Sequence, residues 1–147
     1  MRKFSPARFT RFKNAVLGRD FDCSFTYLPP ARMRAVNRAH RGIDAATDIL
    51  SFRLSDLSGE VLLCEREIVR HAREWGVSPE RYLPYLVIHG LVHIKGFDHG
   101  AIMDTEETHY CRALGVTIPQ SPASDGTAHR SRHRRRDVPG TRSRRAL

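Results

Sequence analysis

The chain contains 147 residues, with 25 lysines and arginines against 16 aspartates and glutamates, and a net charge of +9. This length suits one ordinary domain with a hydrophobic core and is short for two. No apolar run approaches the roughly 20 residues that a membrane-spanning helix requires, so we expect no membrane partner. The three cysteines lie far apart and form no C-x-x-C pair, which argues against a secreted disulfide scaffold and favours a reducing compartment.

The positive charge is concentrated at the C-terminal end. Residues 1–120 carry 17 basic and 14 acidic side chains, a balance of +3, whereas residues 121–147 carry eight arginines and two acids, a balance of +6. We therefore predict a domain over 1–120 and a basic, disordered tail over 121–147, because so few apolar side chains cannot offset the entropy of ordering. Such a tail suits a polyanion such as RNA, and a merely solvated terminus fits equally well.

The first half of the chain predicts helices alternating with short strands. Apolar spacing indicates a helix over 7–17 that ends at Gly18. No acid precedes Asp20, so a mitochondrial transit peptide is the alternative to a cytoplasmic location. The remaining elements predicted here are a strand over 21–27, a helix over 30–40, and a hairpin formed by the runs "ATDILSF" and "GEVLLC".

The second half is mainly helical in pattern. We expect a helix over 65–75, then a helix capped by Ser78 that is interrupted by a fresh start at Pro84. The segment 86–94 is apolar nearly all round, which marks a helix buried between layers. Asp104 and Glu107 have capping-box spacing for a last helix ending at Gly115. The pattern predicts an α+β fold, with a small mixed β-sheet packed against helices and a zincin-like metal-binding helix buried in the core.

Three histidines in the stretch "HGLVHIKGFDHG" have metal-ligand spacing. His89 and His93 are four residues apart, so a helix brings both rings to one face. Gly96 can end that helix, and the returning chain can present His99 from a third direction. Three imidazoles leave one coordination position open for water, as in catalytic zinc sites. We therefore predict one Zn²⁺ per chain at these three residues, although other divalent transition metals also suit imidazole.

Gly90 decides between the chemistries open to such a site. The metzincin run H-E-x-x-H-x-x-G-x-x-H matches here except that glycine replaces the glutamate that acts as general base on peptide bonds. A phosphodiester target needs cationic stabilisation and can be activated by the metal itself. The glycine therefore argues against proteolysis.

The same stretch resembles the H-G-x-L-H-L-x-G-Y-D-H signature of the YbeY family of rRNA-maturation endoribonucleases. Residues 37–52, "NRAHRGIDAATDILSF", are similar to that family's N-x-x-Y-R-x-x-D-x-x-T-D-V-L-S-F run. Residues 59–64 match its G-D-I-V-I-S strand, and Met103 with Glu107 match its M-x-x-x-E pair. The chain departs from the family pattern at His40, where tyrosine is usual, and at Gly100, where an acid is common. The family's first strand also looks shortened here.

The resemblance implies a metal-dependent endoribonuclease specific for single strands, acting in 16S-type 3′-end rRNA maturation and ribosome quality control. Its partners would be rRNA and the ribosome or its small subunit, and its catalytic residues would be His89, His93 and His99 together with Arg41. A guanidinium at Arg41 could hold a phosphate in two-pronged fashion. The sequence leaves the oligomeric state open.

Other side chains in these motifs are given lesser roles. Asp98 is expected to orient a ligand ring or cap the loop. Thr47, Asp48 and Ser51 are interpreted as hairpin and packing residues. His40 is placed on the helix surface. The histidines without companions at ligand spacing are expected to be solvated, namely His71, His109, His129 and His133.

Two rival functions stay open at this stage. A metallopeptidase would need another carboxylate to replace the missing base. A non-catalytic RNA-binding or ribosome-assembly factor would use the metal structurally and would close its shell with a fourth protein ligand, for which Asp98 is the neighbouring candidate.

Overall fold

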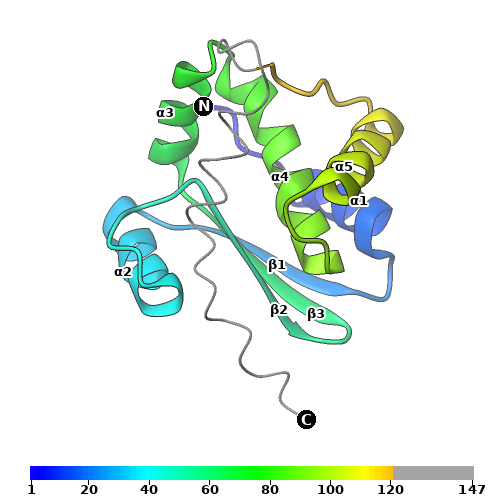
Figure 1. Ribbon diagram of the computed structural model, residues 1–147, viewed down its shortest axis with the longest axis horizontal. Helices are drawn as coiled ribbons and strands as arrows, with labels where there is room; N and C mark the ends of the chain where they lie inside the picture. The colour runs from blue at the N-terminus through cyan, green and yellow to red at the C-terminus, as the bar shows by residue number, and fades with distance from the viewer. Residues whose placement is uncertain (121–147) are drawn as a thin grey trace.

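A computed structural model of the chain describes residues 1–120, so the tail predicted over 121–147 lies outside the described residues (Figure 1). Within these 120 residues, five helices and three strands follow one another in the order α1, β1, α2, β2, β3, α3, α4 and α5. Their bounds are Pro6–Leu17 for α1, Asp22–Tyr27 for β1, Pro30–Arg41 for α2, Ile49–Ser55 for β2, Ser58–Leu63 for β3, Glu65–Glu74 for α3, Pro79–Lys95 for α4 and Ala101–Leu114 for α5. The predicted α+β class is confirmed.

The described strands form one mixed sheet in the order β1-β3-β2. β1 runs parallel to β3, with Asp22 opposite Ser58, whereas β2 runs antiparallel to β3, with Ile49 opposite Leu63. The predicted hairpin is therefore confirmed, with a register shift between Arg53 and Ser55 near its turn. Because β3 is central, β2 is an edge strand of this sheet.

The two faces of the sheet are covered differently. Alternation along β2 sends Ile49 into the main core with α1, α3, α4 and α5, and it sends Leu50 into a smaller cluster with Met33 of α2. In Figure 1, α2 lies on the side of the sheet opposite α4. The sheet is therefore the middle layer, and α2 is the helix that covers its second face among the described residues.

α4 is the central helix of the main core. Ser78 caps it by accepting a hydrogen bond from the Arg81 backbone N–H, and nearly every residue from Tyr82 to Ile94 is buried, as the apolar segment predicts. The predicted fresh start at Pro84 is wrong, because one helix runs from Pro79 to Lys95 through that proline. Proline removes only one backbone donor, and the burial of the flanking apolar side chains outweighs that loss.

α1 belongs to the core. The rings of Phe9 and Phe12 are buried with Val16, as the predicted amphipathic pattern requires, and the helix packs against α4. Ser5 caps its first turn through the Arg8 backbone N–H. These residues are part of the fold. Within residues 1–120, no helix is both long and apolar enough to cross a membrane.

Replacing Phe12 with alanine should lower the free energy of unfolding by about 3–5 kcal/mol, because the side chain is 1% exposed and the cavity left behind would not close fully. The adjacent exposed substitution Arg11→Ala should change it by less than about 0.5 kcal/mol. Urea denaturation followed by circular dichroism measures both values. Equal effects of the two substitutions would contradict the placement of α1 in the core.

Candidate metal centre and its cleft

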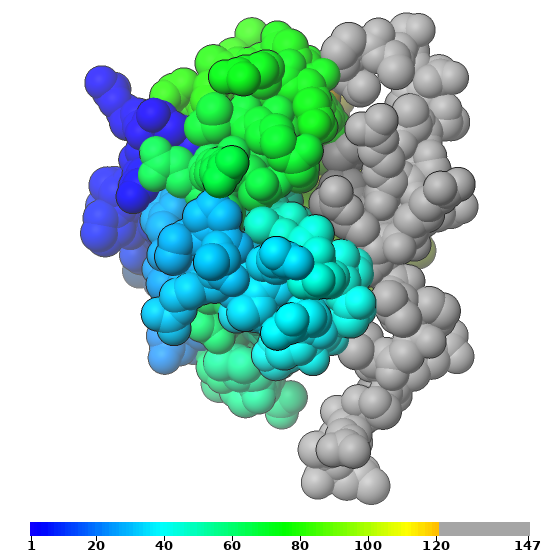
Figure 2. All heavy atoms as spheres, turned by 90° about the vertical axis from the view of Figure 1, so that its left-hand side faces the viewer, coloured from blue at the N-terminus to red at the C-terminus, as the bar shows by residue number. Residues whose placement is uncertain are grey.

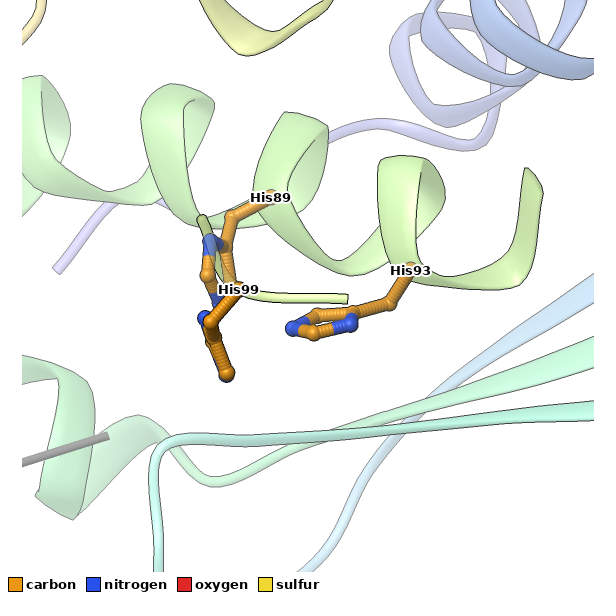
Figure 3. Close-up of side chains that lie close together, drawn as sticks. All are labelled: His89, His93 and His99. Atoms are coloured by element: carbon orange, nitrogen blue, oxygen red, sulfur yellow. The ribbon is translucent and has the colours of Figure 1, made fainter. Parts of the chain in front are cut away.

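The three predicted ligands converge beside α4. Nitrogen atoms of His89, His93 and His99 all lie within 4.8 Å of one another, and the ring centroids are 4.6–5.5 Å apart. Figure 3 shows two rings descending from α4 and the third coming from the chain that follows it. Imidazole nitrogens at this separation suit one transition-metal ion. Within residues 1–120, no fourth His, Cys, Asp or Glu joins the group.

Gly96 allows His99 to approach the other two histidines from a direction that α4 itself cannot supply. It takes the left-handed conformation with φ 116°, and its N–H and that of Phe97 bond back to the carbonyls of His93 and Val92. A residue with a Cβ would be strained at this angle. The helix therefore ends at Lys95, two residues after His93, and the chain returns to present His99, as the spacing predicts.

The carboxylate of Glu107, which was predicted to belong to a capping box, orients the ring of His89. Glu107 is buried, and its Oε1 is hydrogen-bonded to Nδ1 of His89. A ring that donates from Nδ1 keeps Nε2 as the acceptor that a metal requires. The Tyr85 hydroxyl donates to the other carboxylate oxygen at 3.5 Å. Burial, together with Glu107, raises the pKa of Tyr85 well above its usual value, so this hydroxyl stays protonated and remains a donor.

The predicted capping box is therefore wrong. α5 begins at Ala101, three residues before Asp104, and Gly100 occupies the cap position without a side-chain hydrogen bond. Glu107 lies in the second turn on the buried face of α5. Glu107 therefore does not cap α5; its carboxylate binds the His89 ring instead.

The histidines open into a cleft between α4 and the edge strand β2. Arg41 reaches the cleft from the last residue of α2, so the four predicted site residues meet in one place. The remaining lining residues are Thr47, Asp48, Ile49, Ser51, Gly90 and Asp98. Asp98 is exposed and makes no hydrogen bond to the rings within residues 1–120. The ring-orienting carboxylate is Glu107, not Asp98.

Asp48 anchors the wall of the cleft opposite α4. It is 1% exposed, and its Oδ2 lies 2.7 Å from Nδ1 of His71 and accepts from the Tyr82 hydroxyl at 2.7 Å. Its Oδ1 accepts from the backbone N–H of Ile49 at 2.8 Å. A buried carboxylate is tolerated when it is hydrogen-bonded in this way. The network fixes the start of β2 against α3 and α4.

The expectation that His71 is solvated is wrong. Its side chain lies on the buried face of α3 beside Ile68 and Ala72, where the Asp48 carboxylate holds it. His109 is exposed, as expected, while His129 and His133 lie outside the described part of the chain. His40 is also exposed, in agreement with its predicted place on a helix surface.

Gly90 is the point of contact between α4 and β2. A Cβ built there would lie 2.6 Å from Cδ1 of Ile49 and 2.7 Å from Oγ of Ser51. Both distances are below any normal carbon contact, so even alanine would displace these side chains. The glutamate of an H-E-x-x-H peptidase has no room at this position.

Comparisons with known proteins agree with the motifs. A family model described as Endoribonuclease YbeY matches residues 8–114. The Endoribonuclease YbeY of Neisseria meningitidis serogroup B is 35% identical over 67% of this chain and 68% of its own length. That of Aromatoleum aromaticum is 34% identical over 77% of this chain and 79% of its own. A Thermotoga maritima protein solved in solution has a TM-score of 0.54 over 94% of this chain and 95% of its own, at 22% identity, which supports the fold alone.

Replacing Gly90 with alanine should lower the free energy of unfolding by about 1–3 kcal/mol, the usual cost of overpacking. Ile49→Val removes the nearer clashing methyl group, so the double variant should be more stable than the sum of the two single losses. Urea denaturation of the four proteins closes this thermodynamic cycle. Strict additivity would show that the helix and strand do not meet at Gly90.

Proposed function

Because the chain belongs to the YbeY family, we propose that it is an endoribonuclease that cleaves single-stranded RNA with a metal ion held by His89, His93 and His99. One observation carries the proposal: the three imidazoles and the Arg41 side chain share one cleft, with Glu107 behind the first ring. The relatives that match this chain at 34–35% identity are named endoribonucleases.

The donor set fits a divalent transition metal. Three neutral imidazoles suit zinc, with nickel, copper and cobalt as possible substitutes. The absence of a fourth His, Cys, Asp or Glu ligand within residues 1–120 supports an open, catalytic shell over a closed, structural one. The ion would supply Lewis-acid chemistry at a phosphodiester. Zinc is the metal we propose.

Arg41 has the role of phosphate clamp in this proposal. It is half-buried at the C-terminal end of α2, opposite the histidines in the cleft lining. A guanidinium donates two parallel N–H groups to a phosphate and carries its charge at any working pH. Placed there, it would orient the scissile phosphate and stabilise the negative charge that grows in the transition state.

The recessed position of the site supports the proposed preference for single strands. His89 is buried, and His93 and His99 are half-buried in the lining of the cleft, so the reacting phosphate must enter the cleft to reach all three rings. A single strand can bend its backbone to do so, whereas a duplex holds its phosphates on a regular helix. Maturation of rRNA, association with the ribosome or its small subunit, a part in ribosome quality control and a cytoplasmic location extend the same proposal and rest on the family resemblance.

Cleavage assays on a labelled single-stranded RNA, the matching duplex and casein test the activity. We expect zinc-loaded protein to cut the single strand, to cut the duplex far more slowly and to leave casein intact. Removing one ligand in His93→Ala or the clamp in Arg41→Ala should lower cleavage at least 100-fold, with stoichiometric metal retained only in the arginine variant. Elemental analysis measures the metal.

Two controls make that assay decisive. His93→Ala purified in the same way reports any contaminating nuclease, so equal cleavage by this variant and the intact protein would refute the proposal. A substrate with 2′-deoxyribose at the mapped cut site distinguishes attack by water, which it permits, from attack by the neighbouring 2′-hydroxyl, which it prevents. Digestion of casein by the intact protein would favour a peptidase instead.

Glu107→Gln should weaken zinc binding about 10- to 100-fold, because the amide loses the charge that supports the His89 ring. The neighbouring substitution Glu106→Gln serves as the matched control, since Glu106 is half-buried and its side chain pairs with Lys95 and not with a metal ligand. Competition with a chromophoric chelator measures both affinities. Unchanged affinity in the Glu107 variant would show that the carboxylate does not act on a metal ligand.

A further inference from the structure

Two aromatic rings belong to residues that directly adjoin cleft residues in the chain, and neither has a part in the proposed chemistry. His40 is exposed on the last turn of α2, and its ring centroid lies 5.0 Å from that of Phe52, at an angle of 54°. Phe52 is half-buried on β2 and packs beside the cluster under α2. Phe52 therefore packs against the core on one side, and the His40 ring beside it is exposed to solvent.

Both rings are chain neighbours of cleft residues. His40 precedes Arg41, and Phe52 follows Ser51, and both Arg41 and Ser51 line the cleft. Successive side chains of a strand point to opposite faces, so Ser51 faces α4 while Phe52 faces α2. Because β2 is the edge strand, no further described strand separates these two faces there. An RNA strand that leaves the cleft across this edge would therefore meet the two rings next.

The helix that carries His40 is strongly basic. α2 contains four arginines and no acid, and Figure 2 shows it on the outside of the molecule. Arg34, Arg38 and Arg41 recur at i, i+4 and i+7, so they form one stripe that ends in the cleft. Asp44 neutralises Arg34 through hydrogen bonds of 2.7 and 2.9 Å. Arg38 is exposed and also helps to lower the pKa of Asp44, but within residues 1–120 it forms no salt bridge with that carboxylate, whose ion pair is with Arg34.

We infer that His40 and Phe52 form a stacking site for a nucleobase of single-stranded RNA, next to the phosphate in the cleft, with Arg38 binding the following phosphate. The inference rests on the proposed function and extends it from the scissile phosphate to the nucleotide beside it. Aromatic faces bind any base with little sequence preference, and neighbouring arginines follow the backbone. Such a site would select unpaired RNA, because a base held in a duplex cannot present its face to the rings.

Steady-state cleavage of a short single-stranded RNA tests the stacking site. His40→Ala and Phe52→Leu should each raise KM about tenfold, with a much smaller change in kcat, because they remove base stacking and not the reacting groups. His40→Tyr should keep the low KM, since tyrosine offers a larger ring. Leucine at 52 preserves apolar packing, and thermal melting confirms that each variant is folded.

Arg38→Ala should also raise KM and reduce the slope of log KM against log salt by about one. Arg32→Ala is the matched control, because Arg32 is exposed on the same helix but lies on the side opposite Arg41. The control should leave both KM and the slope unchanged. If Arg38→Ala and Arg32→Ala change KM and the salt slope equally, RNA binding depends on the total positive charge of α2 and not on the stripe of Arg34, Arg38 and Arg41.

An abasic nucleotide moved stepwise along the substrate locates the stacked base. At one position beside the cut, loss of the base should raise KM of the intact protein about tenfold and leave KM of His40→Ala unaltered. If His40→Ala responds to the abasic series as the intact protein does, or if both ring variants keep the original KM, the stacking site is refuted while the nuclease stands. If the intact protein cuts no RNA, both proposals fall together.

Discussion

The direct contact of α4 with β2 at Gly90 is the constraint on which the cleft depends. A glycine lets the helix approach the side chains of Ile49 and Ser51 more closely than any other residue would allow. That approach sets the distance between the histidines of α4 and the strand that forms the opposite wall. Because β2 also carries α2 on its other face, the same contact fixes where Arg41 enters the cleft.

Two buried carboxylates then hold the walls in place. Asp48 joins the start of β2 to His71 of α3 and Tyr82 of α4, and Glu107 joins α5 to His89 and Tyr85 of α4. Each is costly to bury alone and stable only with its donors in position. The two networks therefore favour a single arrangement of the helices around the cleft.

The sequence predicted what local spacing determines. The strand alternation, the hairpin, the ends of the helices at glycine and the convergence of the histidines all follow from periods of two and 3.6 residues and from glycine geometry. Glu107 was missed because its spacing from Asp104 imitates a capping box. Its position four residues after Met103, on the buried face of α5, was the signal that could have identified it, since a buried carboxylate requires a partner. The partner of Asp48 could not be read in the same way, because its contacts with His71 and Tyr82 span 23 and 34 residues.

The close approach at Gly90 also explains why ligand spacing shared with peptidases need not give peptidase chemistry. In an H-E-x-x-H helix the residue after the first histidine projects its carboxylate toward the substrate side of the metal. Here that direction is filled by β2, so adding the carboxylate would require the helix and strand to separate. Separation would in turn move Arg41 and Asp48 relative to the histidines. This packing therefore allows either the glutamate base of a peptidase or the arginine clamp of a phosphodiesterase, but not both. The contact at Gly90 excludes the glutamate, and the same contact positions Arg41.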